Sequence, residues 1–215
     1  ATVHPAPVDV AVVGLGSGDT AWASAWREET RSLTVFEISA PQPRILWRLV
    51  GVVDVFDTRR LLEDPRLRIR IEDGRKALEA GEERYDLVET DATWPETAGS
   101  GNLYSVEFFT AASRKLKPGG IMCTWAPTPR VAASFRAVFP HVLEAEGGDV
   151  LIGSLDPIPF EPEVWKARAR GAAPYLGPER TKDVVDALGK LRPAGPPSTA
   201  SPNRDLFPRD EYAVK

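Results

Sequence analysis

The stretch Val8-Asp-Val-Ala-Val-Val-Gly-Leu-Gly-Ser-Gly-Asp19 decides the fold of this chain. An almost wholly apolar run ends in glycines at alternate positions, Gly14, Gly16 and Gly18, and a helical pattern follows from Thr20. A buried strand that enters a glycine turn and then a helix is the opening of a nucleotide-binding βαβ unit. Glycine has no Cβ, so the backbone turns sharply there and approaches a ligand closely.

The spacing of the glycines indicates the kind of nucleotide. The dinucleotide fingerprint has a third glycine three residues after the second, where it admits a pyrophosphate. Asp19 occupies that position here, which argues against a nicotinamide enzyme. The observed Gly-x-Gly-x-Gly pattern is typical of folds that bind S-adenosylmethionine. A purely structural tight turn is the alternative interpretation of the motif alone.

A second apolar run, Leu33–Glu37, ends in a carboxylate 19 residues after Gly18. In βαβ nucleotide folds an acid at about this distance accepts hydrogen bonds from the ribose hydroxyls. A carboxylate can accept both hydroxyls of one ribose. Glu37 is therefore the predicted ribose-binding residue, and a solvated strand end is the alternative.

Composition narrows the class of protein. The chain has 215 residues, a net charge of −4 and no basic stripe, so nucleic acid is not an expected partner. Its one cysteine, Cys123, excludes a disulfide within the chain, and His4 and His141 lie too far apart to suggest a metal site. With no long apolar run or signal pattern, we expect a soluble, cytoplasmic domain without a metal. Only Ala1–Pro7 precede the first strand, as in a domain of a longer protein.

Apolar runs and helical patterns alternate along the chain. The expected parallel strands are Val8–Val13, Leu33–Glu37, Leu67–Ile71, Asp86–Glu89 and Ile121–Trp125. The expected helices between them are Thr20–Glu29, Pro43–Val53, Arg75–Ala80 and Ser105–Leu116. His141–Glu146 and Asp149–Ser154 form an expected antiparallel hairpin. The prediction is a doubly wound, Rossmann-like α/β sheet of the S-adenosylmethionine methyltransferase type, with seven strands and a final antiparallel hairpin.

Composition changes after residue 156, where prolines become frequent. We therefore predict an adenosyl-ligand-binding domain over residues 1–156 and a proline-rich helical extension over residues 157–215, packed on or near it. The extension is expected to hold helices at Glu161–Arg170 and Lys182–Leu191. Ligands of open α/β sheets lie at the carboxyl ends of the strands. The glycine turn, Glu37, Asp73, Gly74 and Asp91 are thus expected around one crevice.

Four segments resemble the spermidine synthase family. They are the third-strand segment Asp64–Gly74, the fourth-strand segment Tyr85–Asp91, the helix start Leu103–Phe109 and the turn Leu116–Gly120. The resemblance covers roughly Val8 to Ser154. It is closest to bacterial spermidine synthase-like proteins in which this domain follows membrane helices. The loop after the fourth strand of those proteins is similar to Trp94–Phe108, and the end of their domain is similar to Asn203–Tyr212.

The resemblance implies transfer of an aminopropyl group from decarboxylated S-adenosylmethionine to a small amine. Asp91 would be the catalytic residue that orients and deprotonates the amine, because a carboxylate both pairs with an ammonium and accepts its proton. Asp73 would accept from the adenine amino group, with Gly74 making room, and Trp94 and Tyr104 would contact the substrate. A homodimer and a membrane-tethered parent protein are further expectations.

Two residues depart from the family pattern. The synthases have an acid where this chain has Ser17, with Asp19 two positions on, and a second acid where it has Trp94. We expect no counterpart of the synthases' N-terminal hairpin domain within these 215 residues. An S-adenosylmethionine-dependent methyltransferase and a non-catalytic nucleotide-binding domain of a membrane protein are therefore kept as alternative functions.

Overall fold

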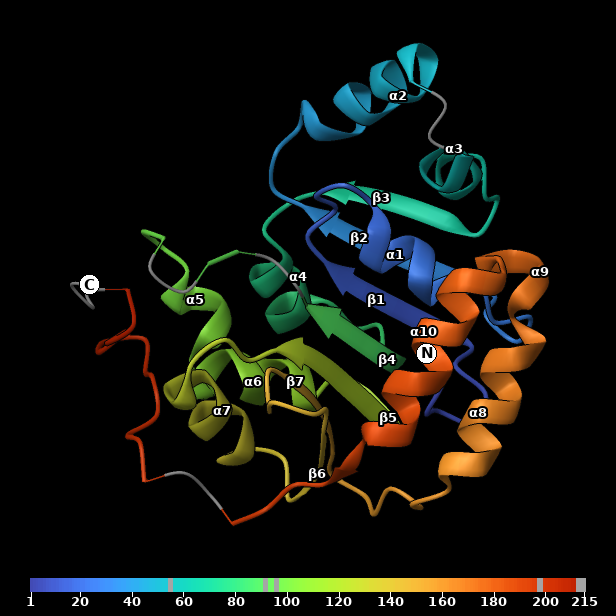
Figure 1. Cartoon of the computed structure of the whole chain (residues 1–215). Coiled ribbons are helices and arrows are strands. Elements are labelled where there is room, and N and C mark those ends of the chain that lie inside the picture. The colour runs from blue at the N-terminus through green and yellow to red at the C-terminus, as the bar shows by residue number, and fades with distance from the viewer. Residues whose placement is uncertain (54–55, 91–92, 95–96, 197–198, 212–215) are drawn as a thin grey trace.

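A mixed sheet with helices on both faces forms the centre of the computed structural model, which describes residues 1–53, 56–90, 93–94, 97–196 and 199–211 (Figure 1). In spatial order the strands are β3 (Leu67–Ile71), β2 (Ser32–Glu37), β1 (Asp9–Val13), β4 (Tyr85–Thr90), β5 (Leu116–Trp125), β7 (Val150–Ser154), β6 (His141–Glu144) and β8 (Arg192–Pro193). The helices are α1 (Asp19–Ser24), α2 (Gln42–Val52), α3 (Phe56–Leu62), α4 (Gly74–Ala80), α5 (Gly101–Tyr104), α6 (Val106–Ser113), α7 (Pro129–Arg136), α8 (Pro162–Gly171), α9 (Ala173–Leu176) and α10 (Pro178–Lys190).

The pairing confirms the doubly wound fold. β1 is parallel to both β2 and β4, so the chain reverses its direction of winding at β1. β7 pairs antiparallel with β5 and with β6, which is the predicted final hairpin. The predicted number of strands is wrong by one: the two-residue strand β8 extends the sheet through the pairs Leu143 with Pro193 and Glu144 with Arg192. A strand this short, and containing proline, carries no alternating pattern that the sequence could reveal.

Side chains of β1 alternate between two apolar layers, as a strand buried on both faces requires. Val10 and Val12 join the layer that α1, α3, α8 and α10 cover, whereas Ala11 and Val13 join the layer beneath α4, α6 and α7. All four are at most 4% exposed. Because both faces of β1 are filled, a ligand can approach this strand at its ends.

The C-terminal helices pack on the same face of the sheet as α1 (Figure 1). Trp165 and Ala169 of α8 and Leu188 of α10 belong to the same buried cluster as Val10 of β1. The extension thus shares a core with the first helix layer. The predicted domain boundary at residue 156 stays a prediction.

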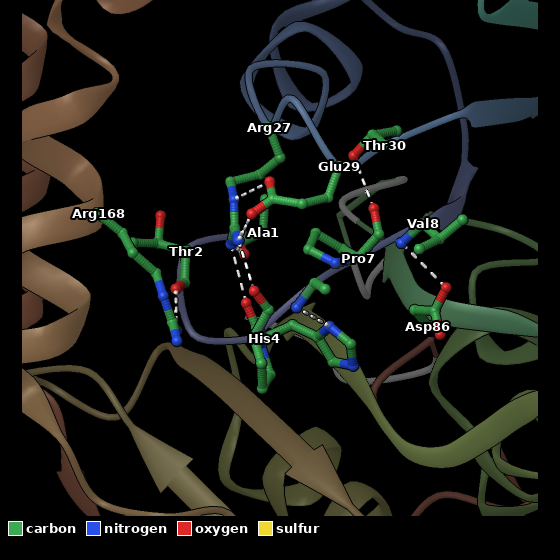
Figure 2. Close-up of polar contacts among 12 residues, drawn as sticks. Ala1, Thr2, His4, Pro7, Val8, Arg27, Glu29, Thr30, Asp86 and Arg168 are labelled. Carbon is green, nitrogen blue, oxygen red and sulfur yellow. Dashed lines mark hydrogen bonds and ion pairs between the residues drawn. The ribbon is translucent and has the colours of Figure 1, made fainter.

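Buried Arg27 holds the N-terminal segment against the sheet (Figure 2). Its guanidinium donates to the carbonyl oxygens of Ala1, His4 and Pro5 at 2.7–2.9 Å. Arg168 of α8 donates to the carbonyls of Thr2 and Val3. Residues 1–7 therefore connect the segment between α1 and β2 to the C-terminal extension.

Several helices were not expected from the sequence. α7 begins after Thr128, whose side chain accepts the N–H of Val131 at 3.1 Å, and Pro129 occupies the first turn. This Thr-Pro start is a recognisable helix signal. By contrast α5 and α9 have four residues each, too few to show a period.

Among the described residues, no helix combines the length and apolar character required to cross a membrane.

Candidate functional site

Three left-handed glycines shape the turn between β1 and α1. Gly14, Gly16 and Gly18 have φ angles of 93°, 50° and 92°. The Gly14 N–H donates to the carbonyl of Phe36 on β2 at 2.8 Å, and the Gly18 N–H closes a turn onto Leu15 at 2.7 Å. Only glycine adopts such angles without strain. The turn is therefore fixed by its own backbone and by the neighbouring strand.

These glycines are not equivalent. A Cβ built on Gly16 would meet no atom within 4 Å, so this position faces open space. A Cβ on Gly18 would approach Leu61 to 3.1 Å, and one on Gly74 would lie 2.8 Å from Val13 Cγ1. Gly16 thus leaves room on the ligand side, whereas Gly18 and Gly74 are required by packing. The resemblance implies that Gly74 makes room for a base, which stays a prediction; the structure shows in addition its close approach to Val13 of β1.

Glu37 lies at the end of β2 beside the glycine turn. One carboxylate oxygen accepts the N–H of Leu15 at 2.9 Å, and the other accepts the N–H of Ser39 at 2.6 Å. The side chain is buried, with 7% of the residue exposed. Each oxygen keeps a further lone pair, because an ionised carboxylate accepts about four hydrogen bonds. Two backbone donors hold the carboxylate in place and leave it able to accept two hydroxyl groups.

A pocket of about 540 Å³ contains the glycine turn, Glu37, Asp73 and Gly74. The structure brings these predicted residues together at the carboxyl end of the sheet. The pocket is also lined by Gln42, whose amide donates to the carbonyl of Gly16 at 2.6 Å, and by Asn102. Neither was predicted, because an amide in a loop or at a helix start has no distinctive sequence signal.

Asp73 has a structural task in addition to its place in the pocket. Its Oδ1 accepts the N–H groups of Arg75 and Lys76 at 2.9 and 3.2 Å, so it caps the start of α4. This capping role is sufficient to explain why an acid occurs at position 73, even if it binds no ligand. Recognition of adenine by Asp73 therefore stays a prediction. Only the second carboxylate oxygen, Oδ2, is left to accept the adenine amino group.

The position where synthases carry an acid holds Ser17, and its hydroxyl donates to Oδ2 of Asp19 at 2.8 Å. Both residues line the 540 Å³ pocket. Although position 17 carries no acid, the Asp19 carboxylate at the start of α1 faces this pocket.

A second pocket, of about 670 Å³, adjoins the first. Thr20 and Thr93 line both pockets, so the two pockets are neighbours. Trp94, 64% exposed, stands in its wall and contacts Trp125 of β5 edge to face, with ring centroids 4.9 Å apart. Glu89 of β4 also lines it. The sequence signal for Glu89 is an acid inside an otherwise buried strand.

Two predicted residues stand apart from this geometry. Asp91 lies outside the described residues. Tyr104 is 1% exposed and is not among the described residues that line the two pockets; its hydroxyl donates to the carbonyl of Thr93. Direct contact between Tyr104 and a substrate is therefore not what the structure favours. Tyr104 instead positions Thr93, where the two pockets join.

The C-terminal segment secures the far wall of the first pocket. Arg75 makes a two-pronged contact with Asp205, at 2.8 and 2.6 Å, and donates to the carbonyl of Asn102 at 3.1 Å. The hydrogen bonds from Arg75 lower the pKa of Asp205, and those to Asp205 raise the pKa of Arg75. Glu211 accepts the N–H of Gly99 at 2.8 Å. Residues 99–103 of the wall thus depend on contacts made by residues 205–211.

No cluster of three or more potential metal ligands occurs among the described residues.

Comparison with known proteins finds a matching family model and similar proteins. The family model for the spermine/spermidine synthase domain matches residues 53–135. The polyamine aminopropyltransferase of Alkaliphilus oremlandii is 34% identical over 140 residues, which are 63% of this chain and 45% of that protein. The chain therefore spans about half the length of the curated relatives that it matches.

Two solved structures share the fold. A spermidine synthase in complex with the transition state analogue AdoDATO has a TM-score of 0.64 at 20% identity, covering 86% of this chain and 71% of that one. Human methyltransferase-like protein 13 in complex with SAH has a TM-score of 0.56 at 20% identity, covering 92% and 88%. These matches confirm the resemblance found in the sequence: the chain has the fold of the spermidine synthase family and, over residues 53–135, matches its spermine/spermidine synthase domain.

Proposed function

We propose that this domain transfers an aminopropyl group from decarboxylated S-adenosylmethionine to a small amine. The observation that carries the proposal is the pair of neighbouring pockets at the carboxyl end of the sheet. One pocket contains the glycine turn and Glu37, and the second shares Thr20 and Thr93 with it. A donor and an acceptor that occupy adjoining pockets meet where the pockets join, and such proximity supplies much of the rate of a two-substrate reaction.

The first pocket suits the adenosyl group of the donor. Glu37 accepts the ribose hydroxyls, and Gly16 leaves the space that the ligand requires. The spermidine synthase and the methyltransferase of the same fold hold AdoDATO and SAH, which supports a ligand of this type here.

Asp19 favours the decarboxylated donor. Its carboxylate lies in the first pocket, held by the Ser17 hydroxyl. The aminopropyl ammonium is attracted to a carboxylate, whereas the carboxylate of intact S-adenosylmethionine is repelled by it. Replacing Asp19 by Asn should therefore narrow the difference in affinity between the two donors.

In the transfer step, the amine nitrogen attacks the aminopropyl carbon bonded to the sulfonium. The new C–N bond forms as the C–S bond breaks, methylthioadenosine leaves, and the amine loses one proton. Asp91, which follows β4, is the proposed acceptor of that proton. Trp94 contacts the acceptor amine, and Tyr104 acts through Thr93.

Methyl transfer from S-adenosylmethionine is the second candidate, favoured by Trp94. An indole occupies the position of the synthases' second acid, so the wall of the second pocket is less suited to two ammonium groups. The neighbour named methyltransferase-like protein 13 holds SAH on the same fold, which supports this candidate.

A donor comparison tests the proposal. The protein is incubated with an amine and with either donor, and methylthioadenosine or S-adenosylhomocysteine is measured by chromatography. We expect methylthioadenosine from the decarboxylated donor, and Asp91→Asn should lower its formation by about 10²–10⁴ while methylthioadenosine still binds. Formation of S-adenosylhomocysteine alone would support the methyltransferase. Binding of either donor without transfer to any amine would refute the proposed aminopropyl transfer.

A further inference from the structure

We propose that the outer face of α2 binds the surface of an anionic lipid bilayer. This face consists of three aliphatic and two basic residues, Ile45, Leu49, Val52, Arg44 and Arg48. The inference goes beyond the proposed function, because none of these residues lines either of the two pockets.

The aliphatic residues form a row along one side of the helix. Ile45, Leu49 and Val52 are spaced by four and three residues, so their side chains lie one above another. They are 52%, 44% and 86% exposed. Single exposed aliphatic residues are common on protein surfaces, whereas a contiguous exposed row of them marks an interaction surface.

The attachment of α2 to the rest of the protein leaves this row uncovered. Leu46 and Val50 are the buried residues of the helix, and Leu46 joins the same core cluster as Leu61 of α3. Figure 1 shows α2 at the outer edge of the molecule, beyond α3 and away from α8 and α10. The helix is therefore held along one narrow line, and its outer face is open to a partner.

Positive charge borders the aliphatic row. Arg48 comes three residues after Ile45 and four before Val52, so it lies beside both. Arg44 lies one turn before Arg48. Both arginines are exposed, and neither has an ion-pair partner within the part of the chain that the structure describes. The sequence from Ile38 to Val53 contains no acid.

This combination fits the interface of an anionic bilayer. Aliphatic side chains on one side of a helix enter the boundary between headgroups and acyl chains, and flanking basic residues are attracted to anionic lipids. Arginine suits that position because its stem packs along apolar surface while its guanidinium reaches a phosphate.

The charges argue against a second copy of the chain on the same face. In a symmetric dimer this face would meet itself, so the arginines of the two copies would approach one another. The helix has 11 residues and is about 16 Å long. Three partly exposed aliphatic side chains present far less than the ~800 Å² that each partner of a stable dimer buries.

Vesicle sedimentation tests the proposal. The protein is mixed with vesicles of phosphatidylcholine alone, or with vesicles in which phosphatidylglycerol replaces a quarter of it. We expect binding to the anionic vesicles that weakens as salt is added, because salt screens exposed charges. Arg44→Gln combined with Arg48→Gln should lower the affinity about 25-fold, at about 5-fold for each arginine. Ile45→Ser combined with Leu49→Ser should lower it about 10-fold or more.

Two controls separate this face from hydrophobicity and charge in general. Trp47 is exposed on the same helix, but it lies two residues from both Ile45 and Leu49 and therefore on another side. Trp47→Ser should bind vesicles like the parent. Arg84→Gln combined with Arg114→Gln removes two exposed arginines outside α2 and should also bind like the parent. Thermal melts and methylthioadenosine binding check that each variant is folded.

Loss of vesicle binding in the arginine and aliphatic variants, with both controls unchanged, supports the proposal. A parent that does not bind anionic vesicles overturns it, and so does equal binding by the parent and the aliphatic variant. Val52→Ser, at the most exposed position of the row, repeats that comparison with a single change if the double variant is unfolded. Analytical ultracentrifugation examines the second copy. A parent dimer that Ile45→Ser with Leu49→Ser converts into monomers would assign the face to self-association and overturn the proposal.

Discussion

The carboxylate of Glu37 accepts the backbone N–H of Leu15 at 2.9 Å, so the end of β2 is tied to the glycine turn that follows β1. The second oxygen is tied to Ser39 in the same way. Each oxygen has one fixed donor and one free direction. A rigid carboxylate loses little conformational entropy on binding two hydroxyls, which favours ligand affinity.

Glu37→Gln should weaken methylthioadenosine binding about 10- to 100-fold. An amide offers one oxygen, so it can no longer accept from both Leu15 and Ser39 and still receive two hydroxyls. Calorimetry measures the affinity, and thermal melts report the accompanying loss of stability. The control is Glu72→Gln just after β3, outside the described lining of the pocket, which should bind like the parent. Equal affinity of Glu37→Gln and the parent would remove Glu37 from the site.

Gly16→Ala should mainly weaken ligand binding, whereas Gly74→Ala should mainly lower stability. A methyl group on Gly16 meets no protein atom and projects into the ligand space, so affinity should fall, while the left-handed backbone adds about 1 kcal/mol of strain. A methyl on Gly74 collides with Val13 at 2.8 Å, which should cost about 1–3 kcal/mol of stability. Melting and methylthioadenosine binding of both variants are compared with the parent. If Gly16→Ala loses only stability, the turn is structural.

The sequence predicts elements best where one strong pattern determines them. The range of β3, Leu67–Ile71, is the same in the prediction and in the structure, because alternating arginines and apolar residues end at clear turn signals. α1 was expected to reach Glu29 but ends at Ser24, since Arg27 turns away to bind the carbonyls of the N-terminal segment. Such long-range contacts have no local signature.

The residues of the candidate site also fall into those that a local pattern predicts and those that depend on contacts distant in sequence. The glycine turn and Glu37 could be predicted because their spacing is dictated by the βαβ unit. The helix-capping role of Asp73 and the burial of Tyr104 depend on three-dimensional neighbours, so neither could be found from the sequence. Glu89 shares the pocket with Trp94 only because β4 and the following loop fold onto one cleft.

The Arg75–Asp205 contact should make stability depend on acid pH. Hydrogen bonds from Arg75 lower the pKa of Asp205 below its ordinary value of 3.8. The stabilisation is therefore present above about pH 4 and is lost as the pH falls through the lowered pKa of Asp205. Asp205→Asn should melt at a lower temperature than the parent at pH 7, and the difference should shrink below about pH 4. A difference that stays constant from pH 7 to pH 3 would contradict this assignment.

Trp22, Tyr175 and two arginines form a stack that joins α1 to the C-terminal extension. The rings of Trp22 and Tyr175 are 5.3 Å apart, Arg60 lies over Tyr175 at 3.9 Å, and Arg180 lies over Trp22 at 4.8 Å. The Tyr175 hydroxyl donates to the carbonyl of Trp22 at 3.1 Å. An ionised Tyr175 could not make that donation, so the stack requires the neutral phenol.

Tyr175→Phe should reveal this requirement at alkaline pH. Burial raises the pKa of Tyr175 from 10.0 to about 12. The unfolded chain therefore releases the phenol proton above pH 10 while the folded chain retains it, and the parent loses stability between pH 10 and pH 12. At pH 8 the variant should be less stable than the parent by about 1 kcal/mol, because one hydrogen bond is lost. This deficit should shrink or reverse by pH 11.5, since phenylalanine does not ionise. Urea unfolding of both proteins at pH 8 and pH 11.5 measures the two differences. An equal deficit at both pH values would show that Tyr175 ionises as readily in the folded protein as in the unfolded one, and would place its hydroxyl outside the buried stack.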